Sequence, residues 1–479
     1  MKYKIKFVII LQFVGLTLFG QKMRTNIVFI LSDDQPFMAQ SSVDPWFSTP
    51  NIDKLAEESV TFTNAFVTSS VCCVSRASIF TGQHSVRNGI ASFDTPLQTE
   101  QLKKSYSGVL RDAGYRTAFL GKYAIGNTRS GAPKELCLPA DQFDMWYGFQ
   151  QSPNYWQMVD GEKKYLTTVM EEKAIRFLKE TPKEQPFLLI MCLPEPHGQS
   201  GPWNYHDPNF KVVAPDGPAK KPASMTQAAY DQLPQAIKDS KNNYVLDVYK
   251  PSLSMSFDKY METVRDYTAR TDLAVGKIRQ ALKDLDLDEN TIVIFASDNG
   301  SMWGAHGIEG KWNMYEESIR GPTMIHDPRL KKLKNGLREQ MALNIDIAPT
   351  IVDLALGYIP EEMQGMSLLP IMKNSKKEGR SDWYYEHEVQ TRAKGKDLPK
   401  CEGVRSKQWK YIRYKDTNPV QEELFDLSVD PQEMNNLVAN GDFNETLVAL
   451  RNRCTELRLP IQLLIFVNSY KKLLLTQQI

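Results

Sequence analysis

The segment VCCVSRASIFTG, residues 71–82, brings two cysteines and an arginine together in a pattern that could do chemistry. Its apolar pair Ile79–Phe80 and its final Gly82 predict a short helix that ends at the glycine. A cysteine at the start of a helix lies near the positive end of the helix dipole, and Arg76 adds a second positive charge. Both favour an anion, either a thiolate or a bound oxyanion, although the segment alone also fits a buried helix with two core cysteines.

Acidic and amide side chains follow two apolar runs that are rich in β-branched residues. Asp33 and Asp34 come shortly after residues 25–31, and Asp298 and Asn299 come shortly after residues 291–296. Such runs predict strands buried on both faces of a mainly parallel sheet. Ligands of these sheets gather beyond the carboxyl ends of the strands. Three carboxylates and one amide oxygen suit Ca²⁺ or Mg²⁺ better than zinc, which prefers nitrogen and sulfur.

A histidine and two lysines occupy comparable positions. His197 follows the apolar run 186–193, Lys122 follows a predicted strand at 115–120, and Lys311 lies between Gly310 and a tryptophan. An imidazole at such a strand end could transfer a proton. Taken singly, each lysine fits a solvated surface charge and the histidine fits a turn, so their weight comes from their shared position.

The order of these residues along the chain resembles that of the formylglycine-dependent sulfatases, a branch of the alkaline phosphatase superfamily. The signature is Cys72-x-x-Ser75-Arg76, followed after three residues by Phe-Thr-Gly. Further blocks that resemble the family follow in the family's order, at residues 49–53, 315–322, 364–370 and 424–437.

The resemblance implies a modified nucleophile and a metal ion. In the family the first cysteine, here Cys72, is oxidised by a formylglycine-generating maturation enzyme to formylglycine, the catalytic nucleophile. The family's metal ion is usually calcium, with magnesium as the alternative. Its ligands would be position 72 and the polar strand ends, namely Asp33, Asp34, Asp298 and Asn299.

The resemblance also implies roles for the cationic residues. Arg76 would hold the formylglycine, Lys122 and Lys311 would bind sulfate, and His197 would contact sulfate and protonate the leaving oxygen. We add His306 and Trp203 as two further candidates for substrate binding.

Two positions depart from the family pattern. Val74 stands where the family usually has proline or alanine, which bears on recognition by the maturing enzyme. Ala124 stands where the family commonly has a histidine that helps to expel sulfate. His84 and His306 are the candidates to compensate for it. These departures keep a non-catalytic sulfated-glycan binder open as an alternative.

The alternation of predicted strands and helices indicates an α/β fold, with a large, mostly parallel sheet flanked by helices on both faces. Helices are expected at 166–178 and 257–285, and a strand is expected at 61–67. From about residue 374 the strand-like pieces become shorter and precede a helix from Glu445 onward. We therefore expect a catalytic domain at 21–373 and a smaller α+β domain at 374–479.

The ends and the overall charge limit location and partners. Residues 1–20 carry three lysines before a short apolar run, which is typical of a secretory signal and too short to span a membrane comfortably. We expect an exported protein, periplasmic or secreted, without stable membrane insertion. The net charge of +1 argues against a nucleic acid partner. Six cysteines in 479 residues do not form a disulfide scaffold.

The predicted substrate is a sulfated poly- or oligosaccharide. The insertion at 198–253 is expected to be a long loop that covers the site. Export and this insertion, which places Trp203 near His197, favour a sugar, because an indole offers an apolar face to a sugar ring. An aryl or steroid sulfatase ranks behind it. A phosphodiesterase or phosphonate hydrolase of the same superfamily remains the other enzymatic alternative.

Overall fold

A computed structural model describes most of the chain after residue 23, namely residues 24–151, 154–197, 217–240, 255–330, 336–389 and 399–476, with 210, 212, 245 and 246. For residues 462–476 only the helical backbone is described. The predicted signal at 1–20 and Trp203 lie outside the described residues. Within the described part, none of the helices combines the length and apolar character needed to cross a bilayer.

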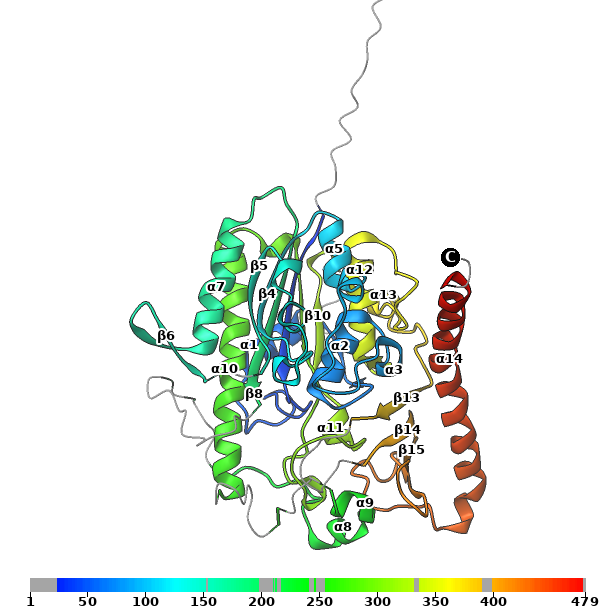
Figure 1. Cartoon of the computed structure of the whole chain (residues 1–479). Helices are drawn as coiled ribbons and strands as arrows, with labels where there is room; N and C mark the ends of the chain where they lie inside the picture. Colours follow the sequence, from blue (N-terminus) through cyan, green and yellow to red (C-terminus); the bar gives the residue numbers. More distant parts are fainter. Residues whose placement is uncertain are drawn as a thin grey trace, which may run out of the picture.

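An eight-stranded sheet forms the centre of the molecule, in the order β11-β2-β10-β9-β1-β8-β4-β5 (Figure 1). β1 pairs in parallel with both β8 and β9, whereas β10 runs antiparallel to β9 and β2. The prediction of a large, mostly parallel sheet is therefore confirmed. The strands are β1 (Asn26–Asp33), β2 (Val60–Phe62), β4 (Arg116–Lys122), β5 (Met145–Phe149), β8 (Phe187–Pro196), β9 (Thr291–Ser297), β10 (Thr323–His326) and β11 (Gly336–Arg338).

Helices cover both faces of this sheet, as Figure 1 shows. Successive side chains of a strand point to opposite faces. Val28 and Ile30 of β1 accordingly join one apolar core, while Phe29 and Leu31 join the other. The first core includes α1 (Pro50–Glu57), α7 (Leu166–Glu180) and α10 (Phe257–Asp284); the second includes α2 (Cys72–Thr81), α5 (Tyr106–Asp112) and α12 (Ile347–Leu356).

A second, antiparallel sheet lies in the C-terminal part, which confirms the smaller α+β unit. Tyr384 and Val404 on one face pack beneath the long α14, drawn in red in Figure 1. Tyr385 and Ile412 on the other face pack against the large domain. The elements are β13 (Asp382–His387), β14 (Cys401–Ser406), β15 (Trp409–Tyr414), β16 (Gln421–Asp426) and α14 (Asn444–Thr476). The boundary at 373/374 stays a prediction.

Two local predictions were wrong. The expected strand at 61–67 is split into β2 and β3 (Ala65–Phe66), because the chain turns at Thr63 and β3 pairs with β12 (Ala342–Leu343) in a separate small sheet. The insertion at 198–253 is not all loop. Its described part contains α8 (Gln227–Gln232) and α9 (Gln235–Lys238).

Short elements complete the described chain, and sequence patterns did not indicate most of them. They are α3 (Ser85–Asn88), α4 (Thr99–Lys103), α6 (Lys134–Cys137), β6 (Trp156–Val159), β7 (Glu162–Tyr165), α11 (Glu316–Ile319) and α13 (Leu369–Lys373).

Candidate active site

The predicted polar residues meet at the carboxyl edge of the large sheet. Asp33 ends β1, Lys122 ends β4, and Asp298 directly follows β9. His197 directly follows β8, whose Pro196 lies opposite Asp33 in the parallel ladder. Four strands that are distant in sequence thus deliver their last side chains to one place, as expected for a parallel sheet.

Cys72 is the first residue of α2 and lies inside this group of side chains. It is 3% exposed, and its Sγ lies 2.7 Å from Lys311 Nζ and 4.0 Å from Asp34 Oδ1. Gly82 ends the helix at φ 66°, as predicted. Burial raises the pKa of the Cys72 thiol to about 11, although Lys122 and Lys311 act in the opposite direction. The unmodified side chain is therefore a neutral thiol near pH 7, and of the two predicted anions a bound oxyanion fits better than a thiolate.

Three cations face three carboxylates in this site. Lys122 pairs with Asp33 and Lys311 pairs with Asp34, while Arg76 Nε lies 2.8 Å from Asp298 Oδ2. These six groups come from β1, β4, α2 and the segment after β9, so docking of all four brings the charges into balance.

The charges set the titration of the carboxylates. Burial alone would raise the pKa of Asp33 and of Asp34, but Lys122 beside the first and Lys311 beside the second hold both below their ordinary value. For Asp298, burial and the charge of Asp33 outweigh Arg76 and raise the pKa. Asp33 and Asp34 are thus held as anions, whereas the ionisation of Asp298 depends more strongly on additional positive charge nearby.

The donor set fits a hard metal ion. Among the described residues, the buried Asp33 Oδ1 has no hydrogen-bond partner. Ligand atoms of Asp33, Cys72 and Asp298 lie within 4.8 Å of one another, as do those of Asp34, Cys72 and His197. Asn299 donates from Nδ2 to Asp34 Oδ1 at 2.7 Å, and its Oδ1 accepts from Lys311 Nζ at 3.4 Å. These oxygens suit Ca²⁺ or Mg²⁺.

His197 lies at the open side of the site. Its side chain is 34% exposed, and Nε2 is 3.7 Å from Asp34 Oδ2. Loss of contact with solvent lowers the pKa of His197, although the negative charge of Asp34 acts to raise it. Its backbone is held by Tyr155, whose hydroxyl donates to His197 O at 2.8 Å and to Pro194 O at 3.2 Å. Tyr155 was not predicted, because it acts on main-chain oxygens and belongs to no residue motif.

The structure places the remaining candidates elsewhere. The His306 ring stacks on Tyr315 at 4.4 Å between centroids, beside a different set of carboxylates. The His84 ring packs 6.4 Å from Tyr384 of the small sheet. Ala124 is buried two residues beyond Lys122, with φ 60°. Neither histidine is thereby brought into the cluster that surrounds Cys72.

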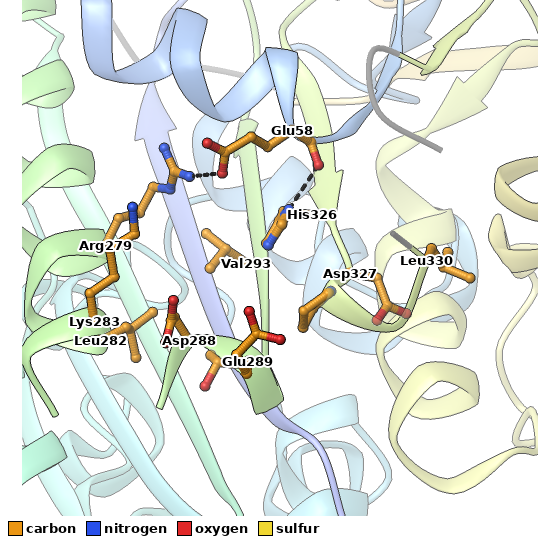
Figure 2. A pocket seen from close by; sticks show the side chains of 12 residues that line it. Glu58, Arg279, Leu282, Lys283, Asp288, Glu289, Val293, His326, Asp327 and Leu330 are labelled. Carbon is orange, nitrogen blue, oxygen red and sulfur yellow. Dashed lines mark hydrogen bonds and ion pairs between the residues drawn. The ribbon is translucent and has the colours of Figure 1, made fainter. Parts of the chain in front are cut away.

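A large pocket lies at the other end of the sheet. It has a volume of about 530 Å³ and is lined by Thr291 and Val293, from the start of β9, among others. Figure 2 shows Arg279 paired with Glu58, and His326 bonded to the Glu58 carbonyl at 2.8 Å. None of the predicted site residues lines this pocket, so it is separate from the candidate active site.

Comparison with protein families gives two matches along the chain. The family described as Sulfatase matches residues 25–358, and the family described as N-sulphoglucosamine sulphohydrolase, C-terminal, matches residues 304–459.

The chain is similar along most of its length to curated relatives. It is 30% identical to an ulvan-active sulfatase of Formosa agariphila over 91% of this chain and 82% of the relative. It is 27% identical to an N-acetylglucosamine-6-O-sulfatase of Bacteroides thetaiotaomicron over 88% of this chain and 84% of the relative.

Solved structures agree on the fold. One neighbour, solved in complex with its substrate D-glucosamine-2-N,6-O-disulfate, has a TM-score of 0.73 at 24% identity and covers 92% of this chain and 98% of its own. The phosphonate monoester hydrolase of Agrobacterium radiobacter has a TM-score of 0.74 at 21% identity and covers 91% and 96%. The fold is therefore shared by enzymes that act on different esters.

The charge balance of the site makes a stability prediction. Lys122→Met removes the ion-pair partner of the buried Asp33, and should lower the free energy of unfolding by about 3 kcal/mol, as measured by urea denaturation in the presence of a chelator. Lys103→Met is the matched control, because Lys103 pairs with Glu100 at 2.8 Å on the surface; it should change stability by less than about 0.5 kcal/mol. Equal stability of the two variants would contradict the proposed balance.

Proposed function

The chain belongs to the sulfatase family and is a sulfuric ester hydrolase. From this premise we propose that it hydrolyses sulfate esters of a poly- or oligosaccharide through a formylglycine at position 72 and a bound calcium ion. The observation that carries the proposal is the position of Cys72 at the start of α2, with its Sγ 2.7 Å from Lys311 Nζ and surrounded by paired carboxylates and cations.

The nucleophile would come from maturation of Cys72. Once oxidised by a formylglycine-generating enzyme, the hydrated aldehyde supplies a hydroxyl group that can attack sulfur, which divides one difficult displacement into two steps. Val74 is 1% exposed and packs with Val71, Cys73 and Val389. The folded chain thus accommodates valine at this position. Whether the formylglycine-generating enzyme oxidises Cys72 in a chain with Val74 is decided by the mass spectrometry described below.

The metal would be held by Asp33, Asp34, Asp298 and Asn299, together with position 72. When bound, Ca²⁺, or alternatively Mg²⁺, supplies positive charge to the oxygens of the sulfate group. Asp34 is held for this role by its backbone N–H, which donates to Asp298 Oδ1 at 3.1 Å.

The cationic side chains would bind the ester. Lys122 and Lys311 both lie near enough to Cys72 to act on its thiol, and they offer preorganised donors to the sulfate oxygens, where negative charge develops. Arg76 is 1% exposed and donates from Nη1 to Lys122 O at 2.5 Å, so it also fixes the end of β4.

His197 would act on the leaving alcohol. Its Nε2 lies near Asp34 while a third of its side chain stays exposed, so it can hold a proton between the site and the entering substrate. Tyr155 would be a positioning residue for it, through the hydrogen bond to the His197 carbonyl.

A sulfated carbohydrate is the substrate class that the relatives favour. Two of them are named an N-acetylglucosamine-6-O-sulfatase and an ulvan-active sulfatase. We keep Trp203 as a proposed sugar-stacking residue. Trp303, by contrast, is 4% exposed and stacks on Phe47 at 5.8 Å, which makes it a core residue. Export to the periplasm or medium, proposed from residues 1–20, suits a polymeric substrate.

One observation favours a second candidate, a sulfated-glycan binder without turnover. Ala124 is buried, in the position where the resemblance leads us to expect a histidine, and neither His84 nor His306 reaches the cluster around Cys72. Release of sulfate would exclude this candidate. The phosphonate hydrolase alternative rests on the fold alone.

Sulfate release is the first test. Protein produced together with a formylglycine-generating enzyme should release sulfate from at least one of a panel of sulfated polysaccharides and oligosaccharides, measured by ion chromatography. Cys72→Ser should lower the rate by about 10³-fold or more, because it removes the nucleophile. Cys73→Ala is the matched control, since the neighbouring cysteine is fully buried and should be dispensable.

The outcomes separate the alternatives. No release by protein whose aldehyde is verified by mass spectrometry would contradict the sulfatase proposal for those substrates. Binding without release would then favour the glycan binder, and hydrolysis of phosphonate esters would favour the other enzymatic alternative. Equal rates for Cys72→Ser and Cys73→Ala would contradict the assignment of the nucleophile.

Calcium should stabilise the folded chain. At a free Ca²⁺ concentration about 100 times the dissociation constant, a site present only in the folded state adds about 2.7 kcal/mol, which calorimetry would detect as a higher unfolding temperature. Asp298→Asn should abolish the shift, whereas Asp284→Asn, an exposed change at the end of α10, should retain it. An equal shift in both variants would place the ion elsewhere, and a larger shift with Mg²⁺ would favour magnesium.

Tyr155→Phe tests the anchoring of His197. Loss of one hydroxyl should lower kcat by about 10-fold and change KM less, because the misplaced imidazole affects the transition state. Tyr106→Phe is the control: among the described residues, the buried Tyr106 hydroxyl has no hydrogen-bond partner. A variant that loses stability but keeps its kcat would show that Tyr155 is merely structural.

A further inference from the structure

A second cluster of ligand-type side chains lies between the large domain and the small sheet. His306 is in the single turn η5 (Ala305–Gly307), Glu317 is in α11, and Glu433 follows β16. One ligand atom from each lies within 4.8 Å of the other two. Two neighbouring segments of the chain and a third that is distant in sequence therefore converge on one point.

Two of these atoms face the cluster without a donor. His306 is 2% exposed, and within the described part of the chain neither its Nε2 nor Glu317 Oε2 has a hydrogen-bond partner. Stacking on Tyr315 fixes the plane of the imidazole. Glu433 is engaged on both sides: its Oε2 accepts from Glu316 N at 2.8 Å, and its Oε1 lies 2.5 Å from Lys410 Nζ. A buried polar atom without a partner is costly and calls for a ligand.

The charges of this cluster do not balance. Its described carboxylates are Glu316, Glu317, Glu423 and Glu433, and the cations that pair with them are Lys410 and Arg405. Glu423 accepts instead from the hydroxyls of Tyr315 and Tyr414. If all four carboxylates are ionised, two negative charges remain.

The cluster also has room and a strained backbone. A cavity of about 10 Å³ adjoins the cluster and is lined by two of its members, His306 and Glu433, but not by Glu317; it is about the size that holds one water molecule or small ion. His306 and Glu433 both have left-handed backbones, with φ 55° and 57°. Such a conformation is unfavourable for a non-glycine residue, and strain of this kind collects at binding sites.

We propose that His306, Glu317 and Glu433 bind a structural divalent metal ion, for which zinc is the best match. One imidazole nitrogen and two carboxylate oxygens, with a water molecule as the fourth ligand, form a donor set that zinc accepts. Its two positive charges balance the cluster. The ion ties the segment after β16 to η5 and α11, and so holds the small sheet against the catalytic domain. The proposal is independent of the reaction at Cys72.

Zinc binding by the full-length chain is the test. All proteins carry Cys72→Ser, so that the thiol in the active site cannot capture the metal. After removal of metal with a chelator, incubation with zinc chloride and desalting, elemental analysis should find one equivalent of zinc per chain, and zinc should raise the unfolding temperature. His306→Gln and Glu317→Gln should each lose the zinc and the shift.

Two matched variants should keep both the bound zinc and the rise in unfolding temperature. His84→Gln changes another buried histidine, one ring nitrogen of which has no hydrogen-bond partner among the described residues, and Asp298→Asn disables the site at the sheet edge. No zinc in the parent protein, or zinc retained by both His306→Gln and Glu317→Gln, would overturn the proposal. If one variant does not fold, as judged by circular dichroism, the other decides. Zinc lost only with Asp298→Asn would assign the ion to the active site instead.

Discussion

Three carboxylates meet at one edge of the sheet, two of them buried and one partly buried, and three cations reach them to offset their charge. Asp33, Asp34 and Asp298 meet Lys122, Lys311 and Arg76 respectively. A buried carboxylate without its partner would be strongly destabilising. Each cation comes from a different element, so the assembly of the site and the docking of β4, α2 and the segment after β9 are one event. The chemistry and the stability of this chain thus depend on the same contacts.

This arrangement explains why the sequence predicts the site better than it predicts the details of the fold. A parallel strand buried on both faces must be a continuous apolar run, so polar residues at its end are conspicuous, and all such ends share one edge. Asp33, Asp298 and His197 could be placed together on that ground alone. Which lysine pairs with which aspartate could not, because side-chain pairing depends on the distances between strands that are not neighbours in sequence.

Other features of the structure have no recognisable signature in the sequence. Tyr155 holds His197 through main-chain oxygens, which any sequence provides. β10 has only four residues, Thr323–His326, and nothing in them reveals that it runs antiparallel to β9 and β2. His306 was expected to bind the substrate or to compensate for the histidine missing at Ala124. The left-handed turn at His306 instead directs its ring to Tyr315 and the seam with the small sheet.

The two clusters differ in what a divalent ion would do to them. At the sheet edge the carboxylates and cations already balance, so an added Ca²⁺ leaves a positive excess, and an anionic sulfate ester is then drawn in. At the seam the carboxylates exceed the cations by two, so an added Zn²⁺ only neutralises the cluster, and nothing else is attracted. The same rule, that buried charge must be compensated, therefore makes one site suited to binding and turnover and the other suited to holding two parts of the chain together.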